Sequence, residues 1–163
     1  MPKLFILCGL PYSGKTRLAR RFLAGNPNLV FVSIDEILAA RGYDWEANRL
    51  PDAEGWRAIF EESYEKTRAA LGEGRDVLYD STNHTRASRD ALRKVAAEAG
   101  ADCRVLFLDV SPEVVRERWH QNRETHERFV LDESLLEQTI ASLERPAGDE
   151  RATTLPSAGA PLL

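Results

Sequence analysis

Eight residues near the N-terminus have the types and spacing of a phosphate-binding loop. The run Gly9-Leu-Pro-Tyr-Ser-Gly14-Lys15-Thr16 matches the pattern G-x-x-x-x-G-K-[ST]. Gly9 and Gly14 allow a tight turn whose backbone N–H groups point at phosphate oxygens. Lys15 can then reach the β- and γ-phosphates of a nucleotide, and the Thr16 hydroxyl can coordinate Mg²⁺. The residues expected to bind the nucleotide here are Gly9, Pro11, Tyr12, Ser13, Gly14, Lys15 and Thr16.

Three acidic residues follow apolar runs of the strand type: Asp35, Asp80 and Asp109. In an open α/β sheet, ligands bind outside the carboxyl ends of the strands. Asp35 could accept the proton of an attacking hydroxyl, and Asp80 fits a Walker B acid that holds Mg²⁺. The alternatives are structural, because Asp35 could cap a helix beginning at Glu36 and Asp80 could be a turn residue. For Asp109, which precedes the helix start Ser111-Pro112, we expect a structural role.

A third group is cationic and lies late in the chain: Arg116, Arg118, Arg123 and Arg128. Phosphoryl transfer needs cations at the equatorial oxygens, and a helical lid can bring them as it closes. The stretch Gln121–Arg128 is polar and has no clear helical period, which favours a mobile lid containing Arg123. The alternative is a solvated helix whose arginines pair with neighbouring glutamates. His120 and His126 lack metal-ligand spacing, and we expect His84 to be an exposed turn residue.

The elements that must position these residues alternate between strands and helices. Continuous apolar runs predict buried parallel strands at residues 3–8, 29–34, 76–80 and 104–110, with a fifth strand at 151–155. Helical spacing predicts helices at about 15–23, 53–71 and 87–99, and two more between 112 and 144. This alternation predicts an α/β fold with a doubly wound parallel sheet.

Length, charge and cysteine content narrow the class of protein. The 163 residues fit one domain, and the net charge of −4 means that nucleic acid could be bound only through a local basic patch. Two cysteines exclude a disulfide scaffold and favour a reducing compartment. No apolar run reaches the length of a membrane-spanning helix, about 18 residues or more. We therefore expect a cytoplasmic protein.

The chain is expected to form a single domain over residues 1–155. Within it, residues 118–130 form the predicted lid, and residues 42–56 form an ordered, partly helical insert on the substrate side. The small and Pro/Gly-rich residues 156–163 are expected to be a flexible tail.

Four motifs together resemble a known group. They are the phosphate-binding loop, Ser33-Ile-Asp35 at the end of the second strand, the turn Asp80-Ser-Thr-Asn83 and the late segment Glu144-Arg-Pro146 to Glu150. With the arginine-rich stretch, they resemble the small P-loop kinases that include polynucleotide 5′-kinase, zeta toxins and chloramphenicol phosphotransferase, with an ATP-binding domain of the AAA_33 type. The resemblance covers residues 3–155 and implies a five-stranded parallel sheet of order 2-3-1-4-5 with a helical lid.

The resemblance also implies an activity, namely transfer of the γ-phosphate of ATP, with Mg²⁺, to a hydroxyl acceptor. Lys15 and Thr16 would bind the nucleotide and metal, Asp35 would be the general base, and Arg123 would be the catalytic lid arginine. Arg118 or Arg128 would assist it.

The resemblance has one departure. Polynucleotide kinases carry an arginine three positions after the base, where this chain has Leu38. The acceptor is therefore left open between a small molecule and a polynucleotide 5′-end. A nucleotide-hydrolysing or nucleotide-sensing module with no acceptor is the alternative function.

Overall fold

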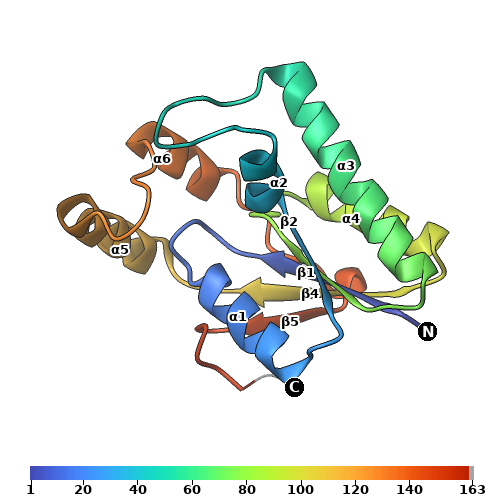
Figure 1. Ribbon diagram of the computed structural model, residues 1–163. Helices are drawn as coiled ribbons and strands as arrows, with labels where there is room; N and C mark the ends of the chain where they lie inside the picture. Colours follow the sequence, from blue (N-terminus) through green and yellow to red (C-terminus); the bar gives the residue numbers. More distant parts are fainter. Residues whose placement is uncertain (162–163) are drawn as a thin grey trace.

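The sheet at the centre of the molecule consists of five parallel strands. The computed structural model describes residues 1–161 and contains strands β1 (Lys3–Cys8), β2 (Val30–Ser33), β3 (Val77–Asp80), β4 (Asp102–Leu108) and β5 (Ala152–Leu155) (Figure 1). Their order is β2-β3-β1-β4-β5, which confirms the predicted α/β fold and strand order. Leu4, Ile6 and Leu7 of β1 are fully buried, because helices cover both faces of the sheet.

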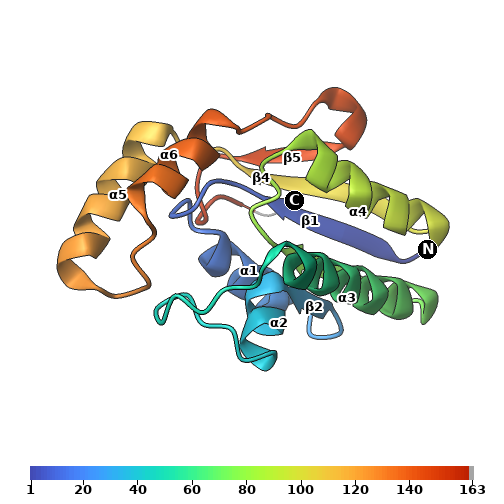
Figure 2. The same cartoon turned by 90° about the horizontal axis from the view of Figure 1, so that it is seen from above.

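Six helices surround this sheet: α1 (Lys15–Gly25), α2 (Ile34–Ala40), α3 (Ala53–Gly72), α4 (Arg86–Glu98), α5 (Pro112–Thr125) and α6 (Glu133–Ala141). One core cluster joins α2, α3 and α4 to one face, and a second joins α1, α5 and α6 to the other. Helices α5 and α6 lie together beyond the carboxyl ends of the strands (Figure 2). No helix within residues 1–161 is long and apolar enough to cross a membrane.

A buried ion pair joins α4 to the short 3₁₀ helix η1 (Gly148–Glu150) before β5. Arg89 Nε and Glu150 Oε2 are 2.6 Å apart, and neither side chain is exposed to solvent. Burial alone would raise the pKa of Glu150, but hydrogen bonds from Arg89 and from the Ala147 amide hold the pKa below its usual value. The neighbouring Arg86 and Arg93 both pair with Asp149. Arg89 is therefore buried and paired, and acids neutralise the arginines of this face of α4.

The arginine-rich stretch is more regular than its sequence indicated. Helix α5 continues through Thr125, so the irregular segment begins at His126 and not at Gln121. The reason is that Val115, Trp119 and Asn122 form one buried helical stripe, in which a polar residue takes the last position. His126 ends the helix in the left-handed conformation, with φ of 52°.

Two further segments differ from expectation. Residues 42–52 contain no helix and form turns closed by an isolated antiparallel bridge between Asp44 and Arg49. The segment after β5 is packed, because Ala158 is 7% exposed and Arg21 donates hydrogen bonds to the carbonyls of Ala158 and Ala160. Residues 162 and 163 of the expected tail lie outside the described residues.

The buried pair gives a stability prediction. Arg89→Met leaves the Glu150 carboxylate buried without its partner, and we expect a loss of about 3–5 kcal/mol in the free energy of unfolding. The double variant Arg89→Met/Glu150→Met removes both charges and should recover much of that loss. Urea denaturation at pH 7 measures both values.

The matched control is Arg116→Met. Arg116 also forms two hydrogen bonds to one glutamate, Glu137, but both side chains are at least 40% exposed. Such surface pairs contribute about 1 kcal/mol or less. Equal losses in Arg89→Met and Arg116→Met would contradict a stabilising role for the buried pair.

Candidate nucleotide and acceptor site

The phosphate-binding loop connects β1 to α1 and is tightly constrained. A Cβ atom at Gly9 would lie 2.9 Å from Ser13 Oγ, so no larger residue fits without movement. Gly14 has φ of 103° and Tyr12 has φ of 62°, which places two residues of the loop in the left-handed region. The Gly9 amide donates to the carbonyl of Thr82 at 3.1 Å, which fixes the start of the loop against the turn after β3.

The polar groups of this loop fit a phosphate. Within residues 1–161, the amides of Gly14, Lys15 and Thr16 have no hydrogen-bond partner, and neither has the buried Ser13 hydroxyl. They lie at the start of α1, where a helix offers its positive end to anions. Lys15 Nζ donates to the carbonyls of Gly9 and Leu10 at 2.8 and 2.9 Å, so its ammonium group is held across the loop.

Lys15 and Asp80 form the charged centre of the site. Burial lowers the pKa of Lys15 to about 8, although the attraction of Asp80 opposes that shift. Burial raises the pKa of Asp80 to about 6, against the attraction of Lys15. Perturbed pKa values of this kind are typical of functional sites, because a cavity that excludes water penalises charges that await a ligand.

Asp80 is positioned by the turn that follows β3. Asn83 is buried with φ of 47°, and its side-chain amide donates to the Leu7 carbonyl at 2.7 Å. The Asn83 carbonyl in turn accepts from Cys8 Sγ and from Arg89. These contacts bind the turn to β1, and they place the Asp80 side chain beside the phosphate-binding loop.

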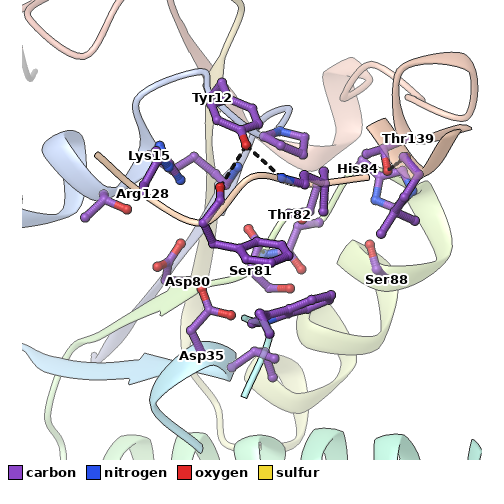
Figure 3. Close-up of a pocket in the computed structure, with 18 of the residues that line it drawn as sticks. Tyr12, Lys15, Asp35, Asp80, Ser81, Thr82, His84, Ser88, Arg128 and Thr139 are labelled. Carbon is purple, nitrogen blue, oxygen red and sulfur yellow. Dashed lines mark hydrogen bonds between the residues drawn. The ribbon is translucent and has the colours of Figure 1, made fainter. Parts of the chain in front are cut away.

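The structure excludes the helix-cap alternative for Asp35. Helix α2 begins at Ile34, and its cap is Ser33, whose hydroxyl accepts from the Glu36 amide at 3.4 Å. Asp35 therefore lies inside the first helical turn with its carboxylate exposed. Figure 3 shows Asp35 and Asp80 at the same cavity, below Lys15. Asp109, by contrast, pairs with Arg145 and does not line this cavity.

The residues present also fit Mg²⁺ held chiefly by a nucleotide. Within residues 1–161, no group of three or more His, Cys, Asp or Glu residues could hold a metal ion by itself. Mg²⁺ is usually bound through one or two protein ligands together with substrate phosphates and water. Thr16 and Asp80, the two expected metal ligands, both line the cavity beside the loop.

The cavity measures about 450 Å³ and extends away from the phosphate-binding loop. Its lining brings together most of the predicted residues: Pro11, Tyr12, Gly14, Lys15, Thr16, Asp35 and Asp80. It also contains residues that the sequence did not single out. These are the aromatic side chains Trp45, Trp56, Phe60 and Phe129 and the polar residues Ser88 and Thr139.

His84 differs from its expected place. It lines the same cavity and is half-buried, and burial lowers the pKa of its imidazole, so the ring is neutral at pH 7. Figure 3 shows it beside Thr139 and near Ser88, at the end of the cavity away from Lys15. This placement could not be predicted from the sequence, because Ser88 and Thr139, which line the cavity with His84, belong to α4 and α6.

The lid arginines have three different surroundings. Arg118 donates to the carbonyls of Tyr12 and Ser13 at 3.0 and 3.2 Å, so it supports the back of the phosphate-binding loop. Arg123 stacks on the Trp119 ring at 4.9 Å and is not among the residues lining the cavity. Arg128 stacks on the Tyr12 ring at 4.8 Å and lines the cavity. Of these three arginines, Arg128 is therefore the one that lines the cavity together with Lys15.

Tyr12 links the phosphate-binding loop directly to the lid loop between α5 and α6. Its hydroxyl donates to the Phe129 carbonyl at 3.0 Å and accepts from the Leu131 amide at 3.1 Å (dashed lines in Figure 3). Asn122 supports the same loop through bonds to the backbone of Arg128 and Phe129. Several side-chain hydrogen bonds therefore hold this loop, although its polar sequence favoured a mobile lid.

We expect Tyr12→Phe to loosen the lid loop. The variant leaves the Leu131 amide without its partner and the Phe129 carbonyl with only its bond from Asn122. A loss of about 1–2 kcal/mol for the two hydrogen bonds corresponds to roughly 5- to 30-fold faster exchange. Hydrogen exchange of residues 126–132 measures this. Tyr64→Phe is the control, since the Tyr64 hydroxyl has no hydrogen bond within residues 1–161. Unchanged exchange in Tyr12→Phe would show that Asn122 and Trp119 hold the lid without it.

Comparison with solved structures places this fold among kinases. A sugar kinase from Janibacter sp. HTCC2649 aligns with a TM-score of 0.71 and 22% identity, over 95% of this chain and 85% of that one. Kti12 from Chaetomium thermophilum, solved with ADP-AlF3, has a TM-score of 0.71 and 24% identity, over 93% and 88% of the two chains. At this identity both comparisons establish the fold alone.

A chain of the Pnkp1/Rnl/Hen1 RNA repair complex aligns with a TM-score of 0.74 and 27% identity, over 87% of this chain. This chain spans only 44% of that one, so the alignment concerns one part of a longer protein. A model of the AAA domain family matches residues 4–146. That range includes the phosphate-binding loop, Asp35 and Asp80, and also the arginines of the late cationic group, Arg116, Arg118, Arg123 and Arg128. The P-loop fold implies nucleotide binding. The chain therefore belongs to the AAA domain family and has the fold of the P-loop kinases.

Proposed function

We propose that this protein transfers the γ-phosphate of ATP to the hydroxyl group of an acceptor. The observation that carries the proposal is the position of Asp35. Ser33 caps helix α2, so the Asp35 carboxylate is not used as the helix cap, and it faces the cavity that Lys15 also lines. A carboxylate at that place can orient an acceptor hydroxyl and take its proton.

The chemistry assigned to each residue follows from its surroundings. The acceptor oxygen forms a bond to the γ-phosphorus as the bond to the β–γ bridging oxygen breaks, and ADP leaves. Asp35 receives the hydroxyl proton. Lys15 and the free amides of Gly14 to Thr16 bind the phosphate oxygens. Mg²⁺, held at Thr16 and Asp80, would neutralise phosphate charge when bound.

We assign the transition-state contact in the lid to Arg128, and we retain Arg123 as the competing residue. Arg128 lines the cavity, and its charge contributes to the lowered pKa of Lys15, so the two cations act on the same region. Arg123 comes from the last turn of α5 and stacks on Trp119. Arg118 supports the loop from behind, which suits a role in nucleotide binding.

The acceptor cavity supports a kinase over a hydrolase. A hydrolase needs space for one water beside the γ-phosphate and a residue to position it. Here the cavity, about 450 Å³ in all, continues from the phosphate-binding loop past Asp35 to Ser88 and Thr139. No glutamine is among its lining residues within 1–161. ATP turnover that yields only inorganic phosphate, with every acceptor offered, would favour the hydrolase.

Asp35→Asn tests the general base. We expect single-turnover transfer to fall by about 10²–10⁴, the range for a positioned general base, while ATP affinity is unchanged. The matched control is Glu36→Gln, because Glu36 is the next carboxylate of the same helix and does not line the cavity. Lys15→Ala serves as the inactive reference. Loss of ATP affinity in Asp35→Asn would identify a metal or structural residue instead.

Arg128→Ala and Arg123→Ala form a second matched pair, since each guanidinium stacks on one aromatic ring of the site region. We expect Arg128→Ala to lower the rate of transfer by about 10³, at the lower end for an arginine that stabilises the transition state. Arg123→Ala should change it less than tenfold. Rapid-quench measurement at saturating ATP separates these rates from ATP affinity. The reverse order of effects would restore Arg123 as the catalytic arginine.

A further inference from the structure

The wall of the cavity beyond Asp35 is aromatic. Trp45 and Trp56 have ring centroids 6.1 Å apart, Trp45 lies 5.8 Å from Phe129, and Trp56 lies 6.3 Å from Phe60. These four residues come from the insert, from α3 and from the lid loop, so three separate segments contribute rings to one surface. Each is only partly buried, and all four line the cavity. Exposed aromatic faces of this kind bind planar rings by stacking.

Cations are confined to the opposite end of the cavity. Of its lining residues within 1–161, only Lys15 and Arg128 carry a permanent positive charge, and both lie at the phosphate-binding loop. His84 lines the cavity as a neutral ring. An acceptor whose hydroxyl meets Asp35 and whose phosphate or carboxylate lies farther into the cavity would bring that anion among aromatic and hydroxyl side chains, where no lining residue within 1–161 carries a full positive charge. An unpaired charge is costly to desolvate.

Two arginines near Asp35, Arg41 and Arg49, each lie beside an acidic side chain. Leu38, one turn after Asp35, is 2% exposed and belongs to the core. Arg41, the next basic residue, pairs with Glu62 at 2.7 Å. A neighbouring hollow shares Asp35 and Trp45 with the cavity and contains Arg49, but that arginine lies 3.7 Å from Asp44 and also faces Glu46 in the same lining. The net charge of this second hollow is negative.

The far end of the cavity offers hydrogen-bond acceptors. The Ser88 hydroxyl donates to the Thr85 carbonyl, and the Thr139 hydroxyl donates to the Leu135 carbonyl, each at 2.8 Å. With their protons engaged, these two oxygens present lone pairs to the cavity. The neutral His84 imidazole beside them supplies one donor and one acceptor. A ligand that reaches this end is best matched by N–H or O–H groups of its own.

We infer that the acceptor is an uncharged small molecule in which a planar ring carries the reactive hydroxyl and a hydrogen-bond donor. The ring stacks between Trp45, Trp56 and Phe129, the hydroxyl meets Asp35, and the donor reaches Ser88 and Thr139. The cavity volume suits one such molecule. This inference rests on the proposed phosphotransfer, and it excludes an acceptor that needs a phosphate contact, such as the end of a polynucleotide.

Matched acceptors test this inference. One pair is uridine and uridine 3′-phosphate, and the second is 4-(hydroxymethyl)benzamide and 4-(hydroxymethyl)benzoate. The members of the first pair differ by one charged phosphate group, and those of the second are nearly equal in size but differ in charge and in the N–H donor of the amide. Ribose and glycerol provide hydroxyls without a planar ring. Phosphate transfer from labelled ATP gives kcat/KM, and quenching of tryptophan fluorescence, with a non-hydrolysable ATP analogue present, gives acceptor affinity without catalysis. We expect each neutral ring compound to exceed its charged partner and the ringless alcohols at least tenfold in both measurements.

A pair of variants tests whether the aromatic wall of the cavity is where the ring compounds bind. Trp56→Leu should weaken binding of the ring compounds about tenfold or more and leave ATP affinity unchanged. Titration calorimetry measures both affinities, because the variant lacks one of the tryptophans that report quenching. Phe22→Leu is the control, because Phe22 packs on Phe5 in the other core cluster and does not line the cavity.

The outcomes separate this inference from the proposed function. Transfer to uridine 3′-phosphate, to the benzoate or to ribose that equals or exceeds transfer to the neutral ring compounds overturns the inference, while the phosphotransfer proposal stands. Ring-selective binding that Trp56→Leu weakens in calorimetry, with no transfer to any acceptor, supports the inference and overturns the phosphotransfer proposal. Absence of quenching by both neutral ring compounds at millimolar concentration overturns the inference.

Discussion

The unpaired amides from Gly14 to Thr16 are the constraint around which this molecule is arranged. Backbone donors without partners are unfavourable, so a loop that keeps several of them facing one point must be held from every side. Here the Gly9 amide fixes the loop to the turn after β3, Arg118 fixes its carbonyls to α5, and the Tyr12 hydroxyl fixes it to the lid. Each of these contacts also positions a second part of the site.

The phosphate-binding loop contacts both ends of the cavity. The end that would hold the nucleotide phosphates and the end that would hold the acceptor are therefore mechanically connected. The Tyr12 hydroxyl bonds the backbone of the lid loop next to Phe129, and the Phe129 ring belongs to the aromatic wall. Arg128 lies on the other side of the same tyrosine. A shift of the phosphate-binding loop on nucleotide binding would therefore move a cation and a stacking surface together. In the proposed phosphotransfer, such a connection would order the two substrates in space before any chemistry occurs.

The places of the strands, of the phosphate-binding loop and of Asp35 and Asp80 in the fold could be predicted from the sequence, because each depends on a short-range pattern of residues. Ser33 and Asp35 are both good helix caps two positions apart, and only the structure shows that Ser33 takes that role. The buried state of Arg89 depends on Glu150, 61 positions later. The aromatic wall and the place of His84 likewise arise from segments distant in sequence. Composition could not distinguish these residues from ordinary core or surface residues.

The packed segment after β5 has a practical consequence. Ala158 lies directly behind the loop, where a Cβ atom added to Gly14 would be 3.1 Å from the Ala158 Cβ. Arg21, from the helix that the loop opens, holds the carbonyls on either side of Gly159. A fluorescent dye attached through a cysteine introduced at Gly159 would therefore report movements of the phosphate-binding loop from the outer surface, without any label in the cavity itself.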